Sequence, residues 1–197
     1  VPGGVSWRAD VQPILQRRCV VCHGCYDAPC QLKLGAWQGL ARGGSSDNVY
    51  DTTRLREAEP SRLFVDAQLP SQWRAKGFFP VLNERSPTPE AQLAGSLLYQ
   101  TLVLKQQHPL PAGPLLGEGF DFSLDRTMAC PRVEQFETHA RKSPLAGMPY
   151  GLPGLDAREV DTLARWLQAG APYEGDVPLT ATQRQQVQSW ETFLNGV

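Results

Sequence analysis

The feature that most constrains this chain is a C-x-x-C-H motif near its amino end, formed by Cys19, Cys22 and His23. Two thiols three positions apart at a helix end can reach both vinyl groups of one porphyrin, and the adjacent histidine then lies under the iron. A zinc site is less well supported, because the chain has no H-x-x-x-H pair and no C-x-x-C outside the 19–25 run. The motif therefore predicts one covalently attached haem c, with thioethers at Cys19 and Cys22 and His23 as the proximal iron ligand.

The segment before the motif is expected to be the helix that carries it. Residues 11–22 are predicted to be helical, with Asp10 as the N-cap. Val11, Ile14 and Leu15 fall on one face at helical spacing. Monohaem cytochromes place such a helix immediately before the attachment site.

The distal side of the iron calls for a second ligand, usually methionine or histidine. Met148 lies in a loop rich in proline and glycine, residues 145–151. An amphipathic helix follows, with Asp156 and Glu159 as a capping box and Gly170 as a stop. A Met-Pro loop leading into such a helix resembles the distal side of class I cytochromes c. Met148 is therefore the predicted distal ligand, and the alternative is that it only packs on the porphyrin.

The other methionine and histidines are weaker candidates for the distal position. Met128 has no comparable context and is expected to pack. His139 shares a predicted helical face with Phe136 and is a competitor. His108 is expected to end a helix, as a surface or capping residue.

Cys25, Cys30 and Cys130 remain outside the motif. In an oxidising compartment two of them are expected to pair. A Cys25–Cys30 bond would close a short loop, whereas Cys30–Cys130 would clamp distant segments. The sequence leaves both open, with a slight preference for the local pair.

The fold is predicted to be all-α, a cytochrome c-like helical domain with long structured loops. Besides 11–22, helices are expected over about 34–40, 88–107, 131–141, 156–170 and 181–194. The domain spans 1–197, with an insertion at roughly 58–131, and is expected to be a portion of a longer chain. The irregular stretches 58–89 and 109–131 either wrap the haem or shape an apolar pocket. Trp37, Tyr50, Arg54 and Arg62 are candidate partners for the haem propionates.

Composition narrows the partners and the compartment. The net charge of −1 gives no indication of nucleic-acid binding. No apolar run approaches the roughly 18–20 residues needed to cross a bilayer. Five cysteines favour an oxidising compartment. The amino end shows no leader pattern, so we expect an exported, periplasmic protein whose signal peptide has been removed.

Longer runs of the sequence resemble a known family. RRCVVCHGCYDAPCQLKLGAWQGLARGG, EPSRLFVDA, WRAKGFFPVLNE, SLLYQTLVLKQQHPLP and GMPYGLPGL resemble the N-terminal haem region of bacterial fatty acid cis/trans isomerases. The resemblance implies a periplasmic enzyme that converts cis double bonds of phospholipid acyl chains, or of free unsaturated fatty acids, to trans. The iron held by His23 would act as an electron acceptor that weakens the C=C bond. Implied partners are these lipids, a transient inner-membrane contact and the remaining domains of the parent chain, with no nucleic acid.

Two other functions compete with the isomerase. One is an electron-transfer cytochrome with a stable His23/Met148 iron and no substrate of its own. The other is a sensor in which a small gas or lipid displaces the distal ligand. A direct iron–alkene complex needs an open iron position. The isomerase therefore requires either a labile Met148 bond or electron transfer through the haem edge.

Overall fold

The computed structural model describes residues 4–26, 28–47, 50–51, 54–55, 61–85, 88–111, 113, 115–118, 120, 130–173, 182, 185–186 and 189. Met128 and nearly all of the helix predicted over 181–194 lie outside these residues. The side chains of Tyr50 and Arg54 are also outside the description.

The described chain is helical, which confirms the predicted all-α class. The helices are η1 (Trp7–Val11, a π-helix), α1 (Gln12–Arg18), α2 (Val20–His23), η2 (Pro29–Gln31), α3 (Trp37–Arg42), α4 (Pro70–Ala75), α5 (Pro89–Ala94), α6 (Leu97–Gln107), η3 (Val133–Gln135), α8 (Phe136–Lys142), η4 (Pro144–Ala146) and α9 (Ala157–Gln168). The strands β1 (Tyr50–Asp51) and β2 (Arg54–Leu55) pair antiparallel. None of the helices in these residues combines the length and the apolar character that crossing a bilayer requires.

The helix before the motif begins earlier than predicted. Ser6 is its N-cap, accepting from the Ala9 N–H, and the Asp10 carboxylate accepts from the Ser6 N–H instead of capping. The prediction that Asp10 is the cap was wrong, because a π-helical turn precedes α1. At Cys19 the φ angle of −127° separates α1 from α2, so the two motif cysteines do not share one continuous helix.

The helix predicted over 88–107 is broken in the middle. Ser96 caps a new helix, α6, by accepting from the Tyr99 N–H, and its hydroxyl donates to the Val81 carbonyl. The apolar stripe runs through both pieces, so periodicity could not reveal the break. Within the stretch predicted to be irregular, Pro70 opens the short helix α4.

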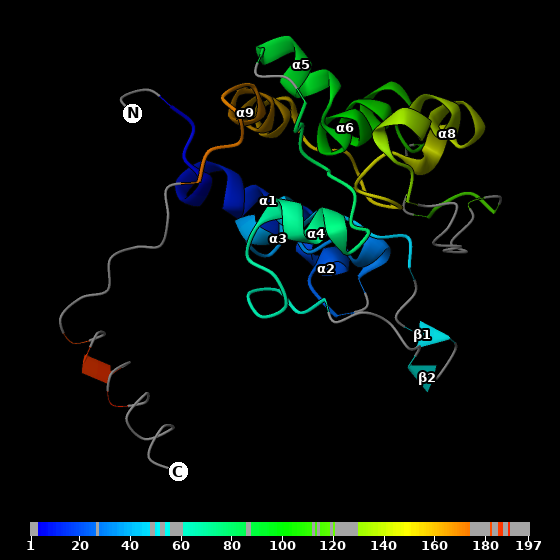
Figure 1. Cartoon of the computed structure of the whole chain (residues 1–197). Helices are drawn as coiled ribbons and strands as arrows, with labels where there is room; N and C mark the ends of the chain where they lie inside the picture. The colour runs from blue at the N-terminus through cyan, green and yellow to red at the C-terminus, as the bar shows by residue number, and fades with distance from the viewer. Residues whose placement is uncertain are drawn as a thin grey trace.

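The core joins the amino-terminal helices to α9. The predicted capping box of Asp156 and Glu159 is present, and α9 buries Leu163 and Trp166 completely. The Trp166 ring lies 5.5 Å from the ring of Trp7 on η1. Each fully buried side chain of this size contributes about 1.5–3 kcal/mol. In Figure 1, α5, α6, α8 and α9 occupy the upper part of the molecule, and α2, α3 and α4 lie below them.

Candidate functional site

The two motif cysteines are free thiols in different surroundings. Cys19 is half-buried between α1 and α2, whereas Cys22 is exposed on α2. Burial raises the pKa of Cys19 to about 11, so this thiol is neutral near pH 7. Neither thiol is tied up in a disulfide, so both are available for covalent attachment.

His23 ends α2 and is buried, with 8% of its surface exposed. Its Nδ1 lies 3.2 Å from the Leu32 carbonyl oxygen, and its own carbonyl accepts from the Leu34 N–H at 3.0 Å. A carbonyl can only accept, so this bond places the proton on Nδ1 and leaves the Nε2 lone pair free. Burial lowers the pKa of His23. The imidazole is therefore held neutral, with Nε2 ready to bind a metal.

The segment around Leu32, which accepts the hydrogen bond from His23, is linked by a disulfide to a distant part of the chain. Cys30 forms a disulfide with Cys130, 100 residues away, while Cys25 is free and exposed. The slight preference for a Cys25–Cys30 pair was wrong. The chain just before η3 passes beside η2, a tertiary neighbourhood that cysteine spacing does not encode.

Met148 lies in a separate loop between η4 and α9, half-buried. Its N–H donates to the Thr101 carbonyl of α6 at 3.0 Å. The preceding Gly147 packs so closely against α6 that a Cβ there would lie 2.3 Å from the backbone nitrogen of Lys105. Cys19, Cys22 and His23 thus sit together on α2 and the turn before it, whereas Met148 is positioned by α6.

Lys105 is a buried cation that sequence reasoning did not single out. It is 2% exposed, and its Nζ is buried without a hydrogen-bond partner in the described structure. Burial lowers its pKa. A local signal existed, because Leu98, Leu102 and Lys105 follow each other at helical spacing on the buried side of α6.

The remaining ligand candidates occupy ordinary positions. His108 is exposed and ends α6, as predicted. His139 is half-buried on α8, with its ring 6.4 Å from the Phe136 ring, and burial lowers its pKa. Of the propionate candidates, Trp37 donates to the Ala171 carbonyl and Arg62 pairs with Asp66.

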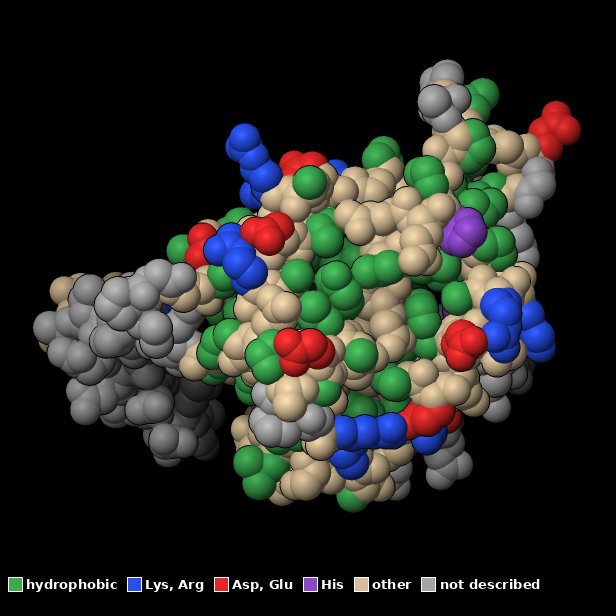
Figure 2. Space-filling model, turned by 90° about the horizontal axis from the view of Figure 1, so that it is seen from above, with side chains coloured by type: hydrophobic (Ala, Val, Ile, Leu, Met, Phe, Trp, Pro, Cys, Tyr) green, Lys and Arg blue, Asp and Glu red, His purple; other side chains and the backbone are tan. Residues whose placement is uncertain are grey.

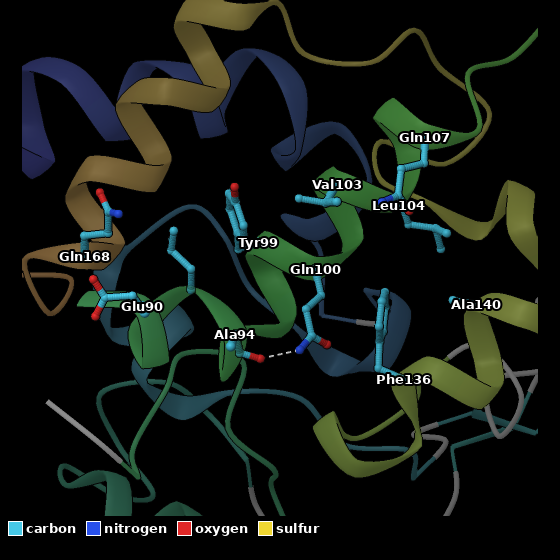
Figure 3. A pocket seen from close by; sticks show the side chains of 11 residues that line it. Glu90, Ala94, Tyr99, Gln100, Val103, Leu104, Gln107, Phe136, Ala140 and Gln168 are labelled. Carbon is cyan, nitrogen blue, oxygen red and sulfur yellow. Dashed lines mark hydrogen bonds between the residues drawn. The ribbon is translucent and has the colours of Figure 1, made fainter. Parts of the chain in front are cut away.

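A groove of about 460 Å³ opens on the face formed by α5, α6, α8 and the end of α9. Figure 2 shows apolar side chains along the middle of this face, with charged side chains around them. In Figure 3, Tyr99, Val103 and Leu104 of α6 and Phe136 of α8 line the groove, and the Gln100 side chain donates to the Ala94 carbonyl. The lining suits an apolar molecule. None of it comes from α1, α2 or α3.

Comparison with known proteins assigns the family. The family model described as fatty acid cis/trans isomerase matches residues 58–197, which begin after the C-x-x-C-H motif. No curated protein and no solved structure was found to match. Since the family match covers more than half of the chain, this chain belongs to the fatty acid cis/trans isomerase family and is an enzyme of that kind.

Proposed function

We propose that this chain is the haem-bearing, cytochrome c-like region of a periplasmic enzyme that isomerises cis double bonds of phospholipid acyl chains to trans. The family match supports the isomerisation reaction. The hydrogen bond from His23 Nδ1 to the Leu32 carbonyl supports the haem, because it leaves Nε2 free in a motif whose two cysteines are outside any disulfide.

The motif residues fit a covalently attached haem. Cys19 and Cys22 would form the thioethers, and His23 would hold the iron through Nε2. When bound, the haem supplies an electron-accepting iron that weakens the C=C bond. The Leu32 carbonyl fixes the imidazole tautomer, and burial lowers the pKa of His23, which favours the neutral ring.

Met148 is the proposed distal ligand. Its loop is held to α6 through the Thr101 carbonyl and through the close packing of Gly147 on Lys105. A proline directly after the methionine stiffens the loop. In the ferric chain, Met148→Ala should abolish the weak near-infrared band of a methionine–iron bond, whereas His139→Ala should leave it intact. A band that survives Met148→Ala would exclude this ligand.

The compartment is proposed to be the periplasm. The Cys30–Cys130 disulfide supports an oxidising environment. Fractionation of expressing cells tests this directly, because a cytoplasmic chain would carry neither the haem nor the disulfide.

A transient membrane contact is proposed at Phe64, Val65 and Leu69, the apolar side chains before α4 that are 56%, 62% and 58% exposed. The net charge of −1 means that such contact would be apolar. Phe64→Asp with Val65→Asp should reduce flotation with phospholipid vesicles. Leu115→Asp, at an 85% exposed position elsewhere, is the matched control. Equal flotation of both variants would rule out this surface.

The decisive experiment combines intact mass with a product assay. We expect the purified chain to carry the mass of one haem and to form trans acyl chains from cis-unsaturated phosphatidylcholine vesicles, measured by gas chromatography. Cys19→Ala with Cys22→Ala should lose both, and Cys25→Ala, at an exposed free thiol, should lose neither. A bare polypeptide mass would refute the haem. No trans product from either this chain or a longer parent chain would refute the isomerase.

An electron-transfer cytochrome is the second candidate, favoured by the way α6 fixes the Met148 backbone. It predicts a methionine–iron band that persists when cis-unsaturated lipid is added. The isomerase predicts either that added lipid weakens the methionine–iron band or that trans product forms while the band stays unchanged. A persisting band therefore favours electron transfer only when no trans product forms.

A further inference from the structure

Arg42 is a buried cation with an unusual set of partners. It lies on α3 with 1% of its surface exposed, and none of the described carboxylates pairs with it. Its Nη1 donates to the Ser61 carbonyl at 2.7 Å, and its Nη2 donates to the Gln31 carbonyl. The guanidinium carbon lies 4.9 Å from the centre of the Phe78 ring. Burial lowers the pKa of Arg42 to about 10, so the group stays charged at neutral pH.

One of these bonds leads directly to the proximal histidine. The carbonyl of the Gln31–Leu32 peptide accepts from Arg42, and the N–H of the same peptide donates to the Pro29 carbonyl at 3.1 Å. The next carbonyl along the chain, that of Leu32, accepts from His23 Nδ1. Both polar groups of the peptide are thus fixed, which restrains the backbone that enters Leu32 and narrows the directions that its carbonyl can take.

We propose that Arg42 is a positioning residue for His23. By holding the Gln31 carbonyl, Arg42 keeps the Leu32 carbonyl aimed at His23 Nδ1 and so maintains the tautomer that leaves Nε2 free. The inference deepens the proposed function and depends on it only for the step from imidazole to iron.

The local backbone conformation explains why the Gln31 carbonyl needs a restraint from outside its own segment. Cys30 and Gln31 have φ angles of 54° and 49°, in the left-handed region that costs about 1–2 kcal/mol per residue without glycine. The disulfide restrains Cys30 from one side. Arg42 is the corresponding restraint on the Gln31 carbonyl. Gln31 also donates from its side chain to the Asp47 carbonyl at 2.9 Å, which holds the side chain but not the peptide.

Nuclear magnetic resonance of the histidine rings tests this in the purified chain, in its reduced, diamagnetic state. The chain has three histidines, so ¹⁵N-histidine labelling gives a spectrum simple enough to assign. We expect a protected His23 Nδ1–H signal in the parent chain. Arg42→Met should raise its exchange rate with water about tenfold, and Arg42→Lys should restore part of the protection.

Arg74→Met is the matched control. Like Arg42, Arg74 donates to backbone carbonyls, which are those of Arg42, Phe78 and Ala41. None of these bonds reaches residues 31–32. Both methionine variants should lower the melting temperature, and only Arg42→Met should deprotect His23. Equal His23 exchange in the two variants, or no protected signal in the parent chain, would overturn the proposal.

A second readout reports on the iron. In the ferrous chain after photolysis of its carbon monoxide complex, the iron–histidine stretching band should shift to lower frequency in Arg42→Met and stay unchanged in Arg74→Met. A parent chain without haem would contradict the proposed function, while the exchange measurement would still decide the role of Arg42. An unshifted band in a haem-loaded Arg42→Met chain would overturn the positioning role alone.

Discussion

The two sides of the proposed iron site are built differently. On the histidine side, the side chain and the backbone of His23 are both hydrogen-bonded to the 32–34 segment. On the other side, the hydrogen bond described for Met148 is made by its backbone N–H, to the Thr101 carbonyl. Beside that loop, Lys105 keeps a buried ammonium without a partner in the described structure, which costs stability.

This contrast agrees with the proposed isomerisation, in which the histidine ligand would stay fixed and the distal ligand would be released. In the proposed enzyme, the histidine would have to hold its orientation throughout, and the restraints on His23 would provide this. In the proposed isomerase, a distal ligand that yields to an alkene must release without unfolding the protein. The backbone bond of Met148 to α6 is compatible with either a stable or a labile ligand, because it does not involve the thioether. If the proposed haem is bound, we expect any change of coordination on the Met148 side.

The largest effect should come from removing the disulfide on the histidine side. Cys30→Ser with Cys130→Ser opens a link across 100 residues and should cost about 4–5 kcal/mol of unfolding free energy, measured by urea denaturation. Cys25→Ser, at a free and exposed thiol, should cost almost nothing. If the two changes cost the same, the histidine side is not held by this bond.

Gly147→Ala should be the most disruptive single change on the Met148 side. The φ of Gly147 is −63°, so alanine fits the backbone conformation, but the alanine Cβ would lie 2.3 Å from the backbone nitrogen of Lys105. We expect a loss of about 2–3 kcal/mol and of the methionine–iron band. Gly154→Ala is the graded control, because its Cβ would meet only the flexible Lys105 Cγ at 3.3 Å. Similar losses for both would show that the loop tolerates displacement from α6.

Lys105→Met should increase stability by about 1–2 kcal/mol at pH 7, because it removes a buried charge that has no described partner. The pKa of Lys105 is lowered in the folded chain, so the unfolded chain binds more protons between that pKa and the ordinary value. Stability of the parent chain should therefore rise with pH across that window, and the variant should lose this rise. Lys142→Met, at an exposed position on α8, should change neither quantity. A destabilised Lys105→Met would reveal a partner for the ammonium.

Ser96→Ala should have the smallest effect, a loss of about 1 kcal/mol, by removing the cap of the helix that carries Thr101 and Lys105. Thr88→Ala removes the cap of α5 and is the control, since the Met148 N–H donates to Thr101 of α6 and not to a residue of α5. Thermal melts give the stability of both, and the methionine–iron band should weaken only in Ser96→Ala. An unchanged band would mean that the loop does not depend on the start of α6.

Local signals explain which parts of the fold were predictable. The capping box of Asp156 and Glu159 lies within four residues, and the Gly170 stop, with φ of +85°, needs no distant partner. The short helix predicted over about 34–40 is present as α3 but lies slightly later in the chain, at Trp37–Arg42, with Gly43 after its last residue. Ser96 has the same chemistry as any cap, but only its burial against Val81 decided that the helix breaks there.

The sequence by itself determined the helical class and the capped α9, because each depends on residues a few positions apart. For the same reason, it is the sequence that predicts haem attachment at the C-x-x-C-H motif. Tertiary structure alone decided that Cys30 pairs with Cys130 and that Arg42 reaches the Gln31 carbonyl. These depend on which distant segments meet in space. Packing of the whole core settles that, and no spacing along the chain records it.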